Sequence, residues 1–307
     1  MSLTETGGPT AAVHGEPALD LLDLLTLEPI GADVFRSTCL FADGPYALFG
    51  GQVAAQALRA AGLTVPEDRV PHSLHGYFVA AGTAAELVEL TVERDRDGRS
   101  FSARRVVVRQ AGRIMFSMGA SFQVAPTGGA GLDLTPSPQV VEPDGLPGVG
   151  LHRMASFEGR FPPHDGPAGL PPTFWARCTT PLGESPILHA CALTYLSDFS
   201  SGLLGLLGLH ERTGSRTGPS LDHALWFHRP ARLDDWVLLD MTARTVGADR
   251  GWYTGTVHTA DGMLVASLAQ EALFRPGRAP EGWFAEPPSA PSAPPAGDRE
   301  QPEDRIR

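Results

Sequence analysis

The sequence predicts an α+β protein in which one architecture occurs twice along the chain. Two observations carry this prediction: each half offers one long helix followed by antiparallel strands, and equivalent residues recur at a nearly constant spacing. Phe227 follows Phe78 by 149 positions, and Ser267 follows Ser117 by 150. A helix and a sheet that each have one apolar face pack with the sheet wrapped around the helix. We therefore expect two tandem repeats whose sheets join into one continuous sheet.

The first repeat is expected over residues 18–124, after a flexible leader at residues 1–17 that is polar and Gly-rich. The Ala-rich stretch Phe49–Ala61 predicts its long helix, because Gly62 stands just past it, where a C-terminal cap is expected. A short amphipathic helix is predicted at Ala18–Leu27. Apolar alternation predicts strands at Asp33–Phe41, His75–Ala80, Ala85–Arg94, Phe101–Gln110 and Arg113–Val124.

A Pro- and Gly-rich linker is expected at residues 125–150, followed by the second repeat over residues 151–275. The helix of the second repeat is predicted at Ile187–Leu207, with a bend near Ser200–Gly202. Its strands are predicted at Met154–Phe161, Phe174–Thr180, Asp222–His228, Trp236–Val246, Gly251–Thr259 and Leu264–Arg275. Residues 276–307 are Pro-rich and charged, which predicts a disordered tail.

The composition excludes several classes of site. All 24 basic residues are Arg, and the absence of Lys removes Schiff-base catalysis, pyridoxal phosphate bound through Lys, Ser–Lys dyads and the Walker P-loop. The formal net charge of −11 argues against a protein that binds nucleic acid through its phosphates. The sequence has neither a GxSxG nucleophile elbow nor a GxGxxG dinucleotide fingerprint after a strand.

Cysteine usage and apolar runs indicate the compartment. Cys39, Cys178 and Cys191 are widely spaced and form no CxxC or zinc-like cluster, so we expect small buried hydrophobic residues in a reducing compartment. The N-terminal residues lack the pattern of a secretory signal. No run of about 18 apolar residues occurs that would span a membrane. We therefore expect a cytoplasmic protein.

Seven short segments occur in a specific order between residues 18 and 275. They are LFGGQVAAQAL at Leu48–Leu58, HSLHGYF at His72–Phe78, RDGRSFSARRV at Arg96–Val106, MGASFQ at Met118–Gln123, YLSDF at Tyr195–Phe199, SLDHALWFHRP at Ser220–Pro230 and ASLAQEALFR at Ala266–Arg275. Together they resemble the TesB-like type II acyl-CoA thioesterases, a double-hotdog family. The resemblance implies a double hotdog fold, hydrolysis of acyl-CoA to free fatty acid and coenzyme A without a cofactor, and assembly into dimers or tetramers.

The resemblance also implies the catalytic residues. In that family an Asp, a Ser or Thr, and a Gln together hold one water molecule. The matching residues are Asp198 in YLSDF, Ser220 in SLDH and Gln270 in LAQE, all within the second repeat. At the repeat spacing of 150, Ala120 is the equivalent of Gln270 in the first repeat. The resemblance therefore implies one working site per chain and a degenerate first half.

The chemistry of these residue types suits a thioester. A thiolate is a good leaving group, so an oriented water suffices if a carboxylate accepts its proton and neutral polar groups fix its position. Asp198 would be the base, or the electrostatic partner of the water. Ser220 and Gln270 would complete the water's hydrogen bonds. The developing oxyanion needs N–H donors, for which backbone amides near a helix end are the usual supply.

Each of the three residues also has a simpler explanation. Asp198 stands before Ser200 and Ser201, where it would merely cap or break a helix. Gln270 lies in an otherwise apolar strand and would face solvent, or would need hydrogen bonds if it were buried. Ser220 follows a Gly-Pro pair and would supply only a turn hydroxyl.

The histidines are interpreted as structural. His72 and His75 are three residues apart, which on a regular strand places them on opposite faces, so a shared metal is disfavoured. Asp222 and His223 resemble half of a charge relay, but adjacent strand residues also point apart. His228 likewise invites a metal or a catalytic dyad, without a partner in the sequence pattern.

Three further interpretations stay open at this point. Arg residues near the family segments are candidates for the coenzyme A phosphates, with ordinary surface Arg as the alternative. These candidates are Arg99, Arg104, Arg105, Arg229 and Arg250. The apolar stretch Leu203–His210 would line the acyl tunnel or simply pack in the core. The same scaffold could also serve a non-catalytic protein that binds acyl-CoA or an acyl carrier. A hotdog hydratase ranks last, because the sequence lacks a hydratase-type Asp and His segment.

Overall fold

The computed structural model describes residues 19–41, 48–126, 128, 131–151, 154–164, 171–199 and 215–276, with the side chains of 215–217 and 275–276 excepted. The elements of the N-terminal half are α1 (Leu21–Leu25), β1 (Leu27–Gly31), β2 (Val34–Ser37), α2 (Gly50–Gly62), β3 (Arg69–Phe78), β4 (Glu89–Asp97), β5 (Phe101–Gln110) and β6 (Arg113–Val124). Those of the C-terminal half are the 3₁₀ helix η1 (Pro143–Gly145), β7 (Gly148–Gly150), β8 (Phe157–Arg160), β9 (Thr173–Cys178), α3 (Pro186–Ser197), β10 (Ser215–Ser220), β11 (Asp222–Phe227), β12 (Val237–Gly247), β13 (Arg250–Thr259) and β14 (Leu264–Pro276).

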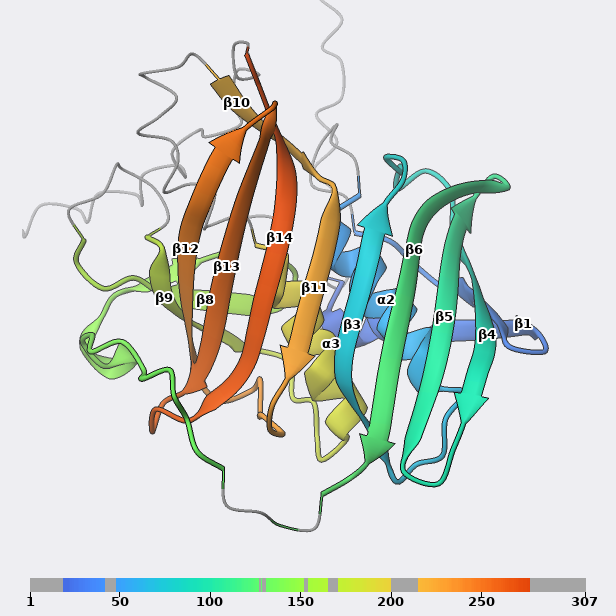
Figure 1. Ribbon diagram of the computed structural model, residues 1–307, viewed down its shortest axis with the longest axis horizontal. Coiled ribbons are helices and arrows are strands. Elements are labelled where there is room, and N and C mark those ends of the chain that lie inside the picture. Colours follow the sequence, from blue (N-terminus) through green and yellow to red (C-terminus); the bar gives the residue numbers. More distant parts are fainter. Residues whose placement is uncertain are drawn as a thin grey trace, which may run out of the picture.

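The described strands form one antiparallel sheet, as the repeat predicted. Its order is β1-β2-β4-β5-β6-β3-β11-β14-β13-β12-β9-β8-β7, and β10 pairs with β14 outside this path. The two halves meet in the middle, where β3 pairs with β11 and His75 lies opposite Ala224. Figure 1 shows the sheet curving around α2 and α3, which lie together on its concave side. The same order of strands on either side of the β3–β11 contact reflects the duplication in the sequence.

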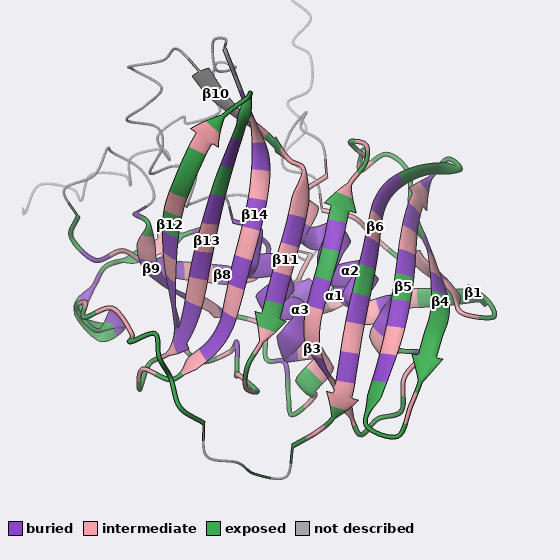
Figure 2. Cartoon of the chain, in the orientation of Figure 1, coloured by how far each residue is buried: buried purple, intermediate pink, exposed green. Residues whose placement is uncertain are grey.

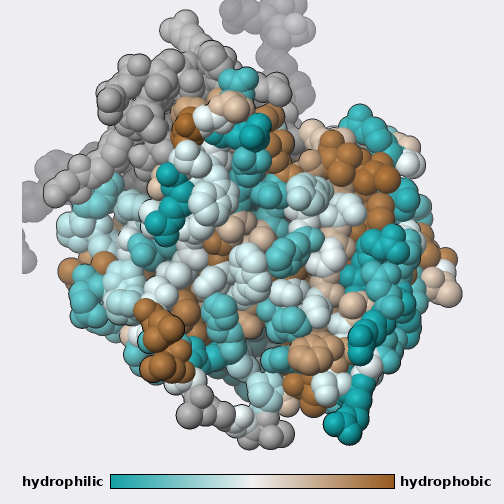
Figure 3. Space-filling model, viewed as in Figure 1, coloured by the Kyte–Doolittle hydropathy of each residue, from teal (hydrophilic) through white to brown (hydrophobic). Residues whose placement is uncertain are grey.

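Burial alternates along the central strands, such as β5 and β6, so the sheet has one apolar face. Figure 2 shows the resulting stripes of buried and partly exposed residues on β3, β11, β13 and β14. The buried residues face the helices and form a core cluster that includes Leu58 and Val106 from the first half and Leu196 and Leu268 from the second. The outer face of the sheet is mostly hydrophilic or neutral in Figure 3. The prediction of sheets packed around helices is therefore confirmed.

Small residues allow the two helices to approach closely. Along the Ala-rich helix α2, Ala54, Ala55 and Ala57 are fully buried. At Gly51 a side chain would collide with the backbone oxygen of Tyr195 on α3. The Ala-rich composition that predicted a helix thus also sets the spacing between α2 and α3.

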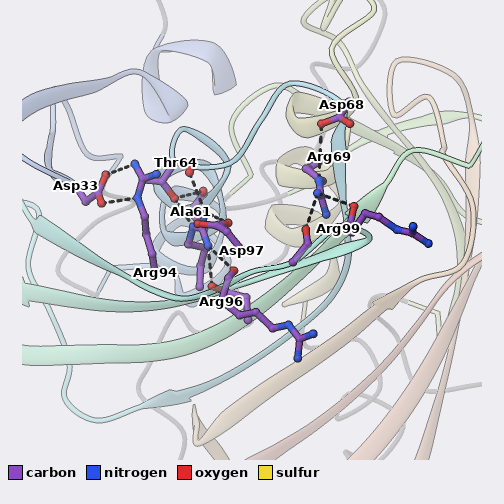
Figure 4. A network of polar contacts seen from close by, with 12 residues as sticks. Asp33, Ala61, Thr64, Asp68, Arg69, Arg94, Arg96, Asp97 and Arg99 are labelled. Carbon is purple, nitrogen blue, oxygen red and sulfur yellow. Dashed lines mark hydrogen bonds and ion pairs between the residues drawn. The ribbon is translucent and has the colours of Figure 1, made fainter.

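A buried arginine fastens the end of α2 to the sheet (Figure 4). Arg104 on β5 is 1% exposed, and its guanidinium donates to the Thr64 carbonyl oxygen at 2.9 Å and to Asp97 Oδ1 at 2.7 Å. It also donates to Thr64 Oγ1 at 2.8 Å and to the carbonyl oxygen of Arg96 at 3.0 Å. Thr64 follows α2, and its hydroxyl donates to the carbonyl oxygen of Ala61 at 2.8 Å. Arg104 is therefore structural, and is not a surface cation available to a ligand.

The predicted elements agree best where the contacts are local. The bounds of β5 and β6 match the prediction, because the two strands form a hairpin around Ala111 and Gly112, both in the left-handed region. The strand β3 starts at Arg69, whereas the sequence predicted His75 as its start. Its early part is strand because it pairs with β6, for example Val70 with Gln123.

Several elements were not predicted. The strands β1, β7 and β10 are short or polar and exist through their pairing with β2, β8 and β14. The segment predicted as a linker contains η1 and β7, and its Val141 carbonyl accepts from Trp175 Nε1 at 2.9 Å. The helix predicted at Ile187–Leu207 ends at Ser197. The predicted bend near Ser200–Gly202, the leader at 1–17 and residues 277–307 of the tail lie outside the described residues, and the repeat boundaries stay predictions.

The cysteines agree in part with the expectation of small buried residues, because Cys39 is only partly buried. Cys39, Cys178 and Cys191 are free thiols, and the latter two are buried. Burial raises the pKa of Cys178 to about 11 and that of Cys191 to about 12, so neither is a reactive thiolate at neutral pH. None of the helices in the described ranges has the length and apolar character needed to cross a bilayer.

Candidate active site

The three residues implied by the resemblance come together at one end of α3. Asp198 is the C-cap of α3, Ser220 is the last residue of β10, and Gln270 lies on β14. The three positions are separated by up to 72 residues in the chain. The antiparallel pairing of β10 and β14 brings Ser220 opposite Ala272, two residues from Gln270. The fold thus places all three side chains beside the end of one helix.

Hydrogen bonds join the three side chains into one cluster. Gln270 Nε2 donates to Asp198 Oδ1 at 2.6 Å and also to Ser220 Oγ. Ser220 Oγ donates to the same Asp198 oxygen at 3.3 Å. Asp198 is 3% exposed and Gln270 is fully buried. The simpler explanation of Gln270 as an outward-facing strand residue is therefore wrong: its amide points into the protein, and its hydrogen bonds are made within this cluster.

The start of α2 faces the same carboxylate. The backbone N–H of Gly51 donates to Asp198. A Cβ at Gly50 would lie 2.5 Å from Asp198 Oδ2, so only glycine leaves room for this approach. The first N–H groups of a helix have no partner within the helix and lie at the positive end of its dipole. The Gly-Gly pair therefore brings unpaired N–H donors beside Asp198.

Burial and hydrogen bonding act in opposite directions on the Asp198 carboxyl. Burial is the largest influence and raises its pKa, because the charged form loses its hydration. The neighbouring His223 and the hydrogen bonds from Gln270, Gly51 and Ser220 favour the charged form and limit the rise. A carboxylate with a raised pKa and a defined set of donors is suited to accept a proton near neutral pH.

Comparisons with known proteins show to which family the chain belongs. A family model described as the acyl-CoA thioesterase N-terminal domain matches residues 42–123, and one described as the acyl-CoA thioesterase C-terminal domain matches residues 133–274. Acyl-coenzyme A thioesterase 8 of Mus musculus is 34% identical over 292 residues, with 82% of this chain and 88% of the mouse protein covered. The chain belongs to the acyl-CoA thioesterase family. This is a family of thioester hydrolases.

Solved structures support the same family and its fold. The crystal structure of an acyl-CoA thioesterase II from Mycobacterium marinum is 39% identical, with a TM-score of 0.69 over 85% of this chain and 98% of that chain. A protein of unknown function with a hot dog fold from Alicyclobacillus acidocaldarius is 21% identical, with a TM-score of 0.67 over 84% of this chain and 97% of that chain. The predicted double hotdog fold is therefore confirmed.

One neighbour of the cluster of Asp198, Ser220 and Gln270 was missed in the sequence. Adjacent strand residues point apart, as predicted for Asp222 and His223: Asp222 Oδ1 accepts the Glu271 backbone N–H at 2.7 Å, while His223 points inward and is fully buried. There its Nδ1 lies 2.5 Å from Gln270 Oε1, and its Nε2 lies 2.8 Å from Ser197 Oγ. The predicted alternation was correct. Only the folded sheet shows that the inward-pointing side chain of His223 contacts Gln270.

The other histidines singled out in the sequence lie elsewhere. His72 Nε2 is 2.7 Å from Ser121 Oγ, and the ring of His75 packs edge-on against Trp226 at 4.9 Å between centroids. Both lie on the outer face of the sheet, so the expectation of opposite faces is wrong. The reason is a shift of register between Pro71 and Ser73, which breaks the alternation. His228, whose Nε2 is 2.8 Å from Ser267 Oγ, is also outside the cluster.

The candidate arginines are largely paired. Arg105 contacts Glu93 and Asp95, Arg229 contacts Asp133 at 2.7 Å, and Arg250 contacts Glu271 at 2.8 Å. The described residues thus point to no particular arginine for the phosphates of coenzyme A. The apolar stretch Leu203–His210, a candidate lining of the acyl tunnel, lies outside the described residues.

A pocket lies at the opposite end of α3. It measures about 230 Å³ and is lined by residues that include Pro71 on β3, Pro186 and His189 at the start of α3, and Phe227 on β11. The repeat spacing of 149 makes Pro71 the equivalent of Ser220. A proline in place of the hydroxyl, together with Ala120 in place of Gln270, accords with a degenerate equivalent of the cluster.

A buried hydroxyl beside Gln270 makes no hydrogen bond within the described residues. Tyr253 on β13 lies directly opposite Gln270, is fully buried, and is close enough to Asp198 for that carboxylate to raise its pKa further after burial. A buried hydroxyl without a partner costs about 1–3 kcal/mol. Tyr253→Phe is therefore expected to increase the free energy of unfolding by about 1 kcal/mol in urea denaturation.

A matched tyrosine provides the control for this prediction. Tyr195 Oη accepts the backbone N–H of Ala155 at 3.1 Å. Tyr195→Phe removes a hydrogen bond that is made, so it is expected to decrease the free energy of unfolding by about 1 kcal/mol. A decrease for Tyr253→Phe of the same size would show that the Tyr253 hydroxyl is hydrogen-bonded in solution, contrary to this prediction.

Proposed function

We propose that this protein hydrolyses acyl-CoA to a free carboxylic acid and coenzyme A, with one water molecule held by Asp198, Ser220 and Gln270. The observation that carries the proposal is the hydrogen-bonded cluster of these three side chains at the glycine-rich start of α2. Family membership supports the reaction class. The cluster supports the residue assignment, because it joins a buried carboxylate to neutral polar groups that can orient water.

Asp198 acts as the general base in the proposed reaction. The water oxygen forms a bond to the thioester carbonyl carbon while one water proton passes to the Asp198 carboxylate. The carbonyl π electrons move to oxygen, which gives a tetrahedral oxyanion. When the C–S bond breaks, its electron pair leaves with sulfur, and the proton on Asp198 passes to the thiolate of coenzyme A. Only water and substrate are consumed.

The start of α2 is the proposed source of oxyanion stabilisation. Gly51 already directs its N–H toward Asp198. The first turn of α2 is the positive end of the helix dipole, which favours a developing negative charge there. Removing one such donor in other hydrolases costs about 10²–10³-fold in kcat. Here the donors are backbone atoms, so the close packing around Gly50 and Gly51 is what holds them in position.

The proposal is tested by measuring free thiol release from acyl-CoA substrates of increasing chain length, from acetyl to palmitoyl. Turnover on at least one chain length is expected, and the same panel gives the chain-length preference. Binding of each acyl-CoA is measured in parallel by calorimetry. Binding without turnover on any chain would overturn the hydrolase proposal and favour the non-catalytic acyl-CoA or acyl-carrier binding protein. Assembly into dimers or tetramers stays an expectation of the resemblance.

A further inference from the structure

The amide of Gln270 is useful to the cluster in only one orientation. With its NH₂ group toward Asp198, it donates to the carboxylate oxygen at 2.6 Å and to Ser220 Oγ. After a flip of the amide, the carbonyl oxygen would face the carboxylate oxygen, and two acceptors would repel each other. The two orientations have nearly the same shape, so packing alone does not select between them. The carboxylate therefore favours one orientation, and a donor at the other end of the amide would hold that same orientation.

The other end of the amide, its carbonyl oxygen, contacts His223. Its Nδ1 lies 2.5 Å from Gln270 Oε1, and both side chains are fully buried. A carbonyl oxygen only accepts hydrogen bonds, so Nδ1 must carry a proton to make this bond. In a neutral ring Nε2 is then an acceptor. The Ser197 hydroxyl, 2.8 Å from Nε2 and 3.1 Å from the Thr194 carbonyl oxygen, donates its one proton to Nε2 in this arrangement. Ser197 immediately precedes Asp198, so this chain of hydrogen bonds begins and ends at the last turn of α3.

The first half of the chain lacks both members of this pair. At the repeat spacings of 149 and 150, Leu74 is the equivalent of His223 and Ala120 is the equivalent of Gln270. Leu74 and Ala120 lie opposite each other on β3 and β6, and both are buried. A histidine kept only for packing or for the β3–β11 contact would have no reason to be exchanged together with the glutamine. The joint replacement indicates that the two side chains serve one purpose.

Burial favours the neutral ring of His223 and outweighs the nearby charges. Burial is the largest influence and lowers its pKa, while Asp198 on α3, Gln270 on β14 and Asp222 on β11 act in the opposite direction. Tyr253 on β13, across from Gln270, stays protonated because burial raises its pKa well above its ordinary value. A neutral imidazole carries a single proton, and the hydrogen bonds described above place that proton on Nδ1.

We propose that His223 is a positioning residue whose Nδ1–H holds the Gln270 amide in the one orientation that presents its NH₂ group to Asp198 and to the attacking water. This rests on the proposed thioesterase function. His223 itself transfers no proton and touches no substrate in this proposal. It acts through Gln270 on the position of the water and on the charge of Asp198.

Two substitutions of His223 separate the hydrogen bond from the packing. His223→Leu introduces the residue of the first half and removes the donor, whereas His223→Asn keeps an N–H close to the position of Nδ1. We expect His223→Leu to lower kcat by roughly 10–100-fold with KM changed less than about threefold, because a displaced water loses its attack geometry. His223→Asn is expected to recover most of that loss. His228→Leu, just past the end of β11, is the control. His228 bonds Ser267 outside the cluster, so this substitution should change kcat less than about twofold.

Two further kinetic results identify the route through Gln270. In a Gln270→Ala background, adding His223→Leu should lower kcat by less than about twofold, because the amide to be oriented is already gone. If the double variant instead lost kcat by the product of the two single losses, the proposal would be contradicted. When Gln270 no longer donates its N–H to Asp198, the charged form of Asp198 is destabilised and its pKa rises. The acid limb of the kcat/KM profile should therefore move to higher pH in His223→Leu and stay near the wild-type position in His223→Asn. An unmoved limb in His223→Leu would also contradict it.

A measurement without substrate separates this proposal from the thioesterase assignment. In ¹⁵N-labelled wild-type protein, the ring nitrogens of His223 are identified as the signals lost in His223→Leu, and their shifts report which nitrogen is protonated. A proton on Nδ1 is expected. A ring protonated on Nε2 alone would overturn the proposal even if the protein hydrolyses acyl-CoA. A proton on Nδ1 in a protein that hydrolyses no acyl-CoA would leave the positioning contact intact and instead reject the proposed function.

Discussion

Replacing Asp198 by Asn is expected to lower thiol release from acyl-CoA by about 10²–10⁴-fold, the usual cost of losing a positioned general base. The substitution nearly preserves shape but removes the carboxylate that would accept the water proton. The side chain is almost fully buried, and its Oδ1 already receives donors from Gln270 and Ser220. We expect kcat to carry the loss and substrate binding to change little, because the carboxylate acts on the water.

The stability and the pH profile of this variant distinguish a catalytic loss from unfolding. Burial raises the pKa of Asp198 above its ordinary value of 3.8. The Asp198 carboxyl group contributes favourably to folding below its unfolded-state pKa, and this contribution is lost as pH rises through its folded-state pKa. At neutral pH the buried charge therefore costs stability. Asp198→Asn should therefore melt no lower than wild type at pH 7.

The raised pKa of Asp198 also predicts how activity changes with pH. The base must be ionised, so wild-type kcat/KM should fall as pH drops through the raised pKa of Asp198, and residual Asp198→Asn activity should lack this limb. Asp222→Asn is the matched control, because Asp222 accepts only the backbone N–H of Glu271 among the described contacts. If Asp198→Asn retained full turnover, the protein would still be a thioesterase, but Asp198 would not take part in its mechanism.

Replacing Arg104 by Met is expected to decrease the free energy of unfolding by about 2–4 kcal/mol. The substitution keeps most of the apolar stem but leaves the buried carbonyl and hydroxyl oxygens of Thr64 without their donor. Asp97 is half exposed and regains water, so the loss comes mainly from the buried acceptors. Urea denaturation with the slope held in common measures the change.

The adjacent arginine provides the control. Arg105 lies next to Arg104 on β5, but its side chain is 51% exposed and pairs with Glu93 and Asp95 in solvent. Exposed ion pairs contribute little to stability, so Arg105→Met should leave the free energy of unfolding almost unchanged. Equal losses at positions 104 and 105 would show that the buried contacts of Arg104 add nothing to stability.

The sequence by itself determined the duplicated architecture, the hairpin of β5 and β6, the helix α2 and the three residues of the candidate cluster. These features depend on short-range patterns: alternation along a strand, turn residues between adjacent strands, and ordered segments that resemble one family. Gly50 and Gly51 were part of such a segment, although their role beside Asp198 was not evident from it. The amides proposed for the oxyanion could not be named for the same reason.

The tertiary structure alone decided how the candidate residues meet. His223 was interpreted as structural because the alternation told only that it points away from Asp222, and said nothing about what lies on the inward face. The outer position of His72 depended on a register shift, and β1, β7 and β10 on partners elsewhere in the chain. Contacts between residues such as Asp198 and Gln270, 72 positions apart, arise from strand pairing and helix packing. Local periodicity carries no information on such pairings, because the free energy that selects them is gained only when the whole sheet closes around both helices.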